Sequence, residues 1–108
     1  MMTRDFHIGD ILSITGNKLV SPRLITGVYD ILNFMTGDNL YTHQLPRARR
    51  ECRPYLLKQY PQLAGVDESG VNEKTWRHWL DASIAEFGEV LPVEPLPEHA
   101  HEFIDPIS

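Results

Sequence analysis

Residues 21–37, "SPRLITGVYDILNFMTG", carry the clearest structural signal in the chain. Ser21 can accept hydrogen bonds from the first amides of a helix, Pro22 suits its first turn, and Gly37 suits a left-handed end. Apolar residues recur at spacings of three and four and form one stripe: Leu24, Ile25, Val28, Ile31, Leu32 and Met35. The stretch therefore predicts an amphipathic helix that anchors the core. Gly27 inside this helix predicts that a neighbouring element packs closely there.

On the N-terminal side of this helix, apolar residues recur at even spacing: Phe6, Ile8, Leu12 and Ile14. This alternation is typical of a β-strand, and "TGNK" at residues 15–18 contains a Gly-Asn pair that suits a tight turn. Leu19 and Val20 can then return as a second strand. The segment predicts an N-terminal β-hairpin.

A second helix is predicted after the loop at residues 38–44, with Pro46 in its first turn. Pro54 falls inside this helix, where it lacks the amide that bonds to the carbonyl of Arg50 and where its ring crowds the turn. We therefore expect a kink, or two short helices that meet near Arg53. The residues expected to face the core are Leu45, Ala48, Cys52, Tyr55 or Leu56, and Leu63.

A third helix is predicted from Asn72, which caps it, to Gly88, which stops it. Beyond it, residues 89–97 are extended, but three prolines lack backbone donors, so the segment is expected to form an edge strand or a polyproline-like strap. The predicted fold class is thus a small single α+β domain over residues 1–108. In this domain, about three helices pack against an N-terminal hairpin that a C-terminal edge strand can join. The two ends, residues 1–5 and 98–108, are expected to be flexible tails.

Length and composition indicate an ordinary globular domain. The chain has 108 residues, of which 42% are hydrophobic and 23% are charged, which suits a single hydrophobic core. No apolar run has the length of a membrane helix, and the N-terminus lacks the apolar core of a signal peptide, so we expect a cytoplasmic protein that binds no membrane. The single Cys52 excludes an internal disulfide and a zinc site built on paired cysteines.

The net charge of −5 is divided between two unlike regions. Residues 47–58 contain five cations and one acid, a net charge of +4, whereas residues 67–105 contain ten acids and two cations, a net charge of −8. If the fold keeps these regions apart, the molecule presents two oppositely charged surfaces, and such surfaces steer partners. The candidate binding residues of the acidic region are Asp81, Glu86 and Glu89.

The strongest polar constellation consists of His43, Gln44, Arg47 and Arg50. The first two precede the predicted second helix, and the two arginines lie one turn apart on it, so both guanidinium groups can reach one phosphate or carboxylate. Two interpretations stay open: an anion site, or a solvated face that pairs with the domain's own acids. Direct nucleic-acid binding is disfavoured, because a net-negative body repels a polyanion outside this patch.

Catalytic residues, cofactors and metals are not expected. His99, His101 and Glu102 have a spacing that occurs in metal sites, but they lie in an acidic tail, for which solvation is the favoured interpretation. Cys52 follows Ala48 and precedes Leu56 by one helical turn, so the spacing places it in the core rather than at a nucleophilic site.

Four blocks of the sequence resemble a family of small uncharacterised proteins of phages and prophages, a domain of unknown function. The blocks are "HIGDILSITGNKLVSP", "GVYDILNFMTGDNLYTHQLPRA", "REC" and "YPQLAGVD", and the resemblance extends from His7 to about Pro106. The family has no assigned catalytic residues to compare. Short phage proteins without catalytic motifs often block or redirect host machinery, and anti-CRISPR proteins are a prominent group among them.

The resemblance thus implies a non-enzymatic, anti-CRISPR-like inhibitor in the cytoplasm of a host bacterial cell. As a monomer or homodimer, it is expected to bind a host defence nuclease or surveillance complex over the nucleic-acid-binding surface of that partner. Two alternatives stay open. One is a phage DNA-handling accessory protein that binds DNA through residues 47–53, and the other is a small enzyme or nucleotide binder around His43.

Overall fold

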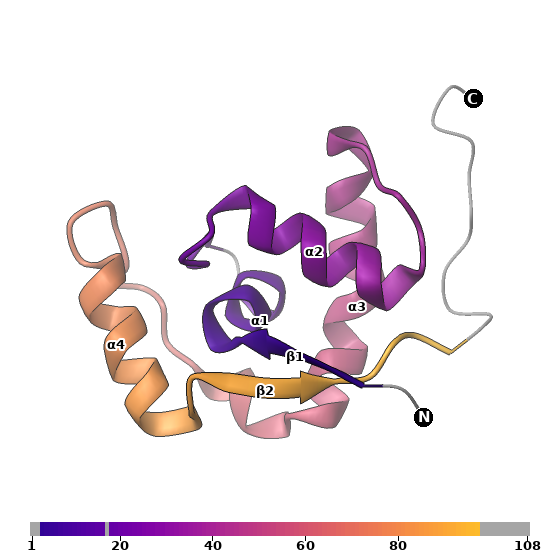
Figure 1. Ribbon diagram of the computed structural model, residues 1–108. Helices are drawn as coiled ribbons and strands as arrows, with labels where there is room; N and C mark the ends of the chain where they lie inside the picture. The colour runs from indigo at the N-terminus through magenta and orange to yellow at the C-terminus, as the bar shows by residue number, and fades with distance from the viewer. Residues whose placement is uncertain (1–2, 17, 98–108) are drawn as a thin grey trace.

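Four α-helices and a two-stranded antiparallel sheet make up residues 3–16 and 18–97, the part of the chain that this computed structural model describes (Figure 1). In chain order the elements are β1 (Arg4–His7), α1 (Ile8–Thr15), α2 (Ile25–Thr36), the 3₁₀ turn η1 (Thr42–Gln44), α3 (Leu45–Gln59), the 3₁₀ turn η2 (Pro61–Gly65), α4 (Trp76–Phe87) and β2 (Val90–Val93). The predicted α+β fold class is confirmed.

The sheet joins the two ends of the described chain. β1 pairs with β2 in antiparallel register, with Phe6 opposite Leu91, and the amide of Ile8 continues the ladder by donating to the carbonyl of Glu89 at 2.8 Å. The predicted C-terminal edge strand is therefore confirmed. The predicted pairing of the first strand with Leu19 and Val20 is wrong, because the chain turns into a helix at Ile8.

Helix α1 occupies the segment in which the alternation of apolar residues predicted a strand. His7, just before the helix, is its N-terminal cap. The backbone of His7 is extended, and its Nδ1 atom accepts a hydrogen bond from the amide of Gly9 at 2.9 Å. All eight residues of α1 are buried. A helix enclosed on every side carries apolar residues on several faces, so its sequence fits the even spacing of a strand as well as the spacing of a helix.

Helix α2 forms as predicted in its body and differs at its start. Val28, Ile31, Leu32 and Met35 are buried, and Gly37 ends the helix with a left-handed φ of 70°. The helix begins at Ile25 rather than near Ser21. The Ser21 hydroxyl donates to Asp10 of α1 and accepts from the amide of Arg23, in a turn that precedes the helix. The predicted burial of Leu24 and Ile25 is wrong, since they are 57% and 48% exposed.

Leu24 has a strained backbone, with φ of 57° and ψ of −137°, a region that glycine alone adopts readily. Such strain costs roughly 1–3 kcal/mol, whereas the added flexibility of glycine in the unfolded chain costs about 0.5–1 kcal/mol. We therefore expect Leu24→Gly to raise the free energy of unfolding by about 1 kcal/mol in urea denaturation. Leu24→Ala keeps the strain and is the matched control. Equal losses of stability in the two variants would contradict this prediction.

Helix α3 is one continuous helix from Leu45 to Gln59, so the predicted division into two short helices near Arg53 is wrong. Both Pro54 and Arg50 lie on the exposed side of α3. Water can therefore reach the Arg50 carbonyl that lacks the Pro54 amide, which makes the proline tolerable. The residues predicted to face the core are buried: Leu45, Ala48, Cys52, Leu56 and, in η2, Leu63.

Helix α4 begins at Trp76, four residues after Asn72. The Asn72 side chain forms a turn before the helix, in which its Oδ1 accepts from the amides of Lys74 and Thr75. In Figure 1, α4 stands at one side of the molecule and α3 at another, and both contact α1. None of the helices in the described ranges combines the length and apolarity needed to cross a bilayer.

Candidate functional site

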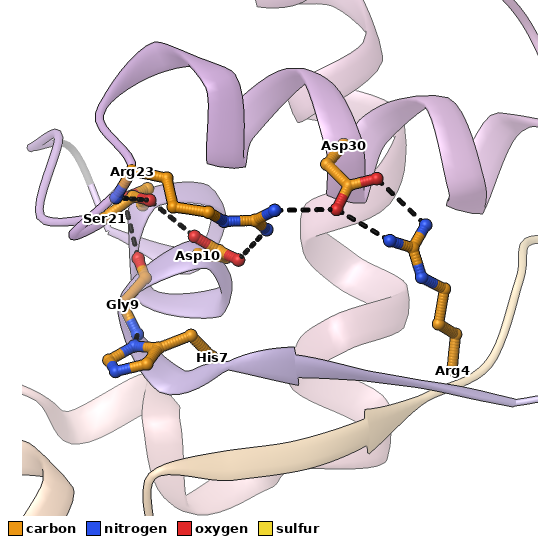
Figure 2. Close-up of polar contacts among 8 residues, drawn as sticks. Arg4, His7, Gly9, Asp10, Ser21, Arg23 and Asp30 are labelled. Atoms are coloured by element: carbon orange, nitrogen blue, oxygen red, sulfur yellow. Dashed lines mark hydrogen bonds and ion pairs between the residues drawn. The ribbon is translucent and has the colours of Figure 1, made fainter.

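The carboxylate of Asp10 is the centre of a buried polar cluster between α1 and the turn that precedes α2 (Figure 2). Asp10 is 0% exposed. Its Oδ1 accepts from the hydroxyl of Ser21 at 2.5 Å, and its Oδ2 accepts from Nη2 of Arg23 at 2.6 Å. A buried carboxylate is stable only when such partners replace the water that it loses.

The cluster continues outward as a chain of alternating charges, Asp10–Arg23–Asp30–Arg4, which we call the ion-pair chain (Figure 2). Arg23 donates to Asp30 at 3.1 Å, and Arg4 donates with both terminal nitrogens to the same carboxylate at 2.9 and 2.8 Å. A two-point arginine contact of this kind fixes orientation as well as distance. The ion-pair chain thereby links β1, α1 and α2.

Gly27 brings α2 directly onto the buried end of the ion-pair chain. A Cβ atom at this position would lie less than 3.0 Å from both Asp10 Oδ1 and Ser21 Oγ. The close packing that Gly27 predicted is therefore confirmed, and its partner is the Asp10–Ser21 hydrogen bond.

The polar groups of this cluster are hydrogen-bonded to one another and do not form a reactive site. The Ser21 hydroxyl donates to Asp10 and accepts from the Arg23 amide, and Ser21 is fully buried. The hydrogen bond with Asp10 raises the pKa of Arg23 above its usual value, against the effect of burial. This arrangement stabilises the scaffold, and it gives Ser21 neither a base nor access to a substrate.

Asp30 makes stability depend on pH. Burial alone would raise the pKa of Asp30, but hydrogen bonds and charge from Arg4 and Arg23 outweigh it, so the pKa is lowered. A lowered folded-state pKa contributes stability above the unfolded value of about 3.9, and this contribution is lost as the pH falls. We expect the difference in unfolding free energy between wild type and Asp30→Asn to shrink below about pH 4. A difference that stays constant from pH 7 to pH 3 would contradict the assignment.

The predicted basic constellation lies at the start of α3, and the structure assigns its members different roles. His43 and Arg50 are exposed. Gln44 Oε1 accepts from the amide of Tyr41 at 2.8 Å and so caps η1, whereas Arg47 lies 4.0 Å from Glu51. Of the four side chains predicted to surround one anion, Gln44 and Arg47 therefore have partners within the domain. His43 and Arg50 are the two exposed members.

Tyr41 is a surface residue of this region that the sequence interpretation missed. Its side chain is 58% exposed, and its ring stacks on His43 with centroids 6.2 Å apart and an interplanar angle of 26°. Spacing gave no signal for it, because Leu40 and Tyr41 lie in a loop, and the structure shows that Leu40 is the buried one of the two.

The predicted acidic residues lie on and after α4. Asp81 and Glu86 are exposed on the helix, and Glu89 is exposed in the connection to β2. The first two are five residues apart, a rotation of about 140° around a helix, so they point to different sides of α4. Residues 67–94 contain seven acids and two cations, a net charge of −5. The backbone of Glu94 hydrogen-bonds to Gln59 of α3, and Glu68 lines a pocket together with Arg53, so the acids of α4 rather than the whole segment are set apart from α3.

The remaining candidates give no reactive site in the part of the chain that the structure describes. Cys52 is 0% exposed, and burial, assisted by the charge of Glu51, raises the pKa of its thiol to about 12, which confirms its place in the core. Residues 3–16 and 18–97 contain no group of three potential metal ligands, and the spacing at 99–102 lies outside them.

Three pockets among the described residues lie away from the basic constellation. One pocket of about 760 Å³ lies between α3 and residues 92–97, and its lining includes Tyr55, Lys58 and Tyr60. Two smaller pockets are lined from α1, α3, α4 and the segment around η2. His43 lines none of these three, so an enzyme site around His43 has no support from their positions.

Comparison with known proteins identifies a family. Residues 6–66 match the family described as a domain of unknown function (DUF7736), a segment that contains α1, α2, α3 and η2. No curated protein and no solved structure matches the chain. The buried end of the ion-pair chain, Gly27 and the start of α3 all lie within the matched residues. The chain thus belongs to the DUF7736 family of domains of unknown function.

Proposed function

We propose that this protein is an anti-CRISPR-like inhibitor that binds a host defence nuclease by inserting α4 into the nucleic-acid-binding surface of that enzyme. The observation that carries the proposal is the exposure of Asp81 and Glu86 on α4, and of Glu89 just after it, on an element other than the basic α3. Nucleic-acid channels are lined by arginine and lysine, and carboxylates bind these side chains through the same charge-assisted hydrogen bonds as phosphates do.

The orientation of the acids favours a channel over a flat surface. Asp81 and Glu86 point to sides of α4 that differ by about 140°. A flat basic surface would contact one of these carboxylates, whereas a channel contacts both with its two walls. α4 packs on α1, and Glu86 lines a pocket with Gln62 and Val66, so one wall of such a channel would meet Glu86 beside the η2 segment and the other would meet Asp81.

The phage setting of this proposal is an argument by association. It comes from the resemblance of the blocks around "MTGDNLYTHQLPRA" to small phage and prophage proteins. Fold class alone assigns no activity, so the choice of a defence nuclease as partner depends on this resemblance and on the charge of α4.

Capture of partners from nuclease-treated bacterial lysate tests the proposal. Tagged wild type is compared with the triple variant Asp81→Lys, Glu86→Lys and Glu89→Lys, and with the control Arg50→Glu and Arg53→Glu, which changes charge on α3. We expect wild type and the control to capture one nuclease in stoichiometric amount and the triple variant to lose it. Capture by the triple variant, or recovery that requires nucleic acid, would contradict the proposal.

A further inference from the structure

The connection between α2 and α3 presents two stacked aromatic rings to solvent. Tyr41 is 58% exposed and His43 is exposed, so neither ring is used to fill the core. In Figure 1 the first turns of α3 extend beyond α2 at the top of the view, away from α4. Flat aromatic faces in this position are available to a partner that is itself flat and apolar on its faces.

Hydrogen bonds order the backbone of the connection that carries this aromatic pair. The amide of Leu40 donates to Asn33 Oδ1 at 3.0 Å, and the amide of Tyr41 donates to Gln44 at 2.8 Å. The hydroxyls of Thr42 and Tyr29 are also hydrogen-bonded to each other. A segment that is already ordered loses little conformational entropy when a ligand binds.

Two arginines are exposed on α3, the helix that follows these rings in the chain. Arg50 and Arg53 are exposed, and within residues 3–16 and 18–97 neither takes part in an ion pair. Arg50 follows His43 by seven residues, about two helical turns, which favours the same side of the molecule for these two side chains. Arg53 lies about one turn further along α3 and lines a pocket with Gly16 and Glu68. Tyr41, His43, Arg50 and Arg53 together form what we call the aromatic–basic surface.

The acids of α4 lie on the other side of α1 from α3 (Figure 1), whereas Glu68 lines a pocket together with Arg53. The molecule measures 40 × 29 × 20 Å, and α1 lies between α4 and α3 in Figure 1. The Debye length at physiological ionic strength is about 8 Å, less than the diameter of the intervening helix. The local charge of α3 rather than the net charge of −5 therefore governs what approaches this end.

We infer that the aromatic–basic surface binds single-stranded nucleic acid. Unpaired bases stack on aromatic rings, and the adjacent guanidinium groups bind the phosphates, a combination that tolerates any sequence. A duplex offers phosphates but hides its base faces, and an acidic peptide offers carboxylates without flat rings, so each would use the arginines alone. The inference concerns a different side of the molecule from α4 and does not rest on the proposed inhibitor function.

Fluorescence anisotropy with labelled probes, at about 50 mM salt, tests the inference, and the oligonucleotides are about 16 nucleotides long. The probes are oligo(dT), oligo(U), a duplex of equal length and polyglutamate. We expect the single strands to bind at least about fivefold more tightly than the duplex. Tyr41→Ala should weaken single-strand binding about fivefold or more, the loss of one stacked base, whereas Tyr41→Phe should preserve it.

A matched pair of charge reversals separates a local site from bulk charge. Arg50→Glu should weaken binding and reduce its dependence on salt, whereas Arg77→Glu, the same change on the exposed side of α4, should leave affinity within about twofold of wild type. Four outcomes would each overturn the inference: no binding of single strands by wild type, equal affinity for the duplex, equal losses in the two variants, or tighter binding of polyglutamate. Circular dichroism spectra verify that each variant is folded.

Discussion

Gly27→Ala is expected to lower the free energy of unfolding by about 3–5 kcal/mol. The new methyl group would lie less than 3.0 Å from Asp10 Oδ1 and from Ser21 Oγ, both of which belong to buried side chains. Either α2 must move away from α1, or the Asp10–Ser21 hydrogen bond must break. Overpacking alone costs roughly 1–3 kcal/mol, and disturbing a buried charged group adds to it.

Urea denaturation at pH 7, followed by circular dichroism, measures this effect. Gly65→Ala is the matched control, because nothing lies within 4 Å of the Cβ position at Gly65 and its φ is not positive. This control should change stability by less than about 0.5 kcal/mol. If both variants unfolded at the same urea concentration, the close packing of α2 on Asp10 would be wrong.

Asp10→Ala is expected to lower the free energy of unfolding by about 3 kcal/mol. The substitution leaves the buried Ser21 hydroxyl without its acceptor and creates a cavity under α2. The Arg23 guanidinium limits the loss, since its side chain is 45% exposed and can turn to water. The effect is therefore placed at the lower end of the range for a broken buried ion pair.

A double-mutant cycle with Ser21→Ala checks the cause of the Asp10 effect. Because the two residues share one hydrogen bond, the double variant should lose less stability than the two single variants together. Asp81→Ala, on the exposed side of α4, is the control for loss of a carboxylate and should be nearly neutral. Additive losses at Asp10 and Ser21 would show that the hydrogen bond between them contributes little.

The sequence predicted those parts of the fold in which one helix face meets the core and the other meets water. Apolar spacing predicted the body of α2 and the core positions of α3, and the residue type of Gly37 predicted the end of α2. Helix α1 does not, because it is buried on all sides and its apolar residues match two periods equally well. The start of α2 was also unpredictable, since Ser21 bonds to a residue 11 positions away.

The candidate sites show the same limit. His43 and Arg50 were found because charge and helical spacing are visible in a short motif. The ion-pair chain was not found, because its contacts join residues 7, 13 and 26 positions apart and exist only after the helices have packed. The exposure of Tyr41 depends likewise on which side of the loop the core occupies.

Competition for a captured nuclease tests most directly the claim that α4 acts by occupying a nucleic-acid-binding surface. The nuclease is first saturated with a labelled oligonucleotide, and the Arg50→Glu, Arg53→Glu variant is then added, so that the aromatic–basic surface does not bind the probe. We predict that the anisotropy falls to the value of the free oligonucleotide at a stoichiometric amount of the variant. Unchanged anisotropy, with both ligands bound to the nuclease at once, would contradict the claim.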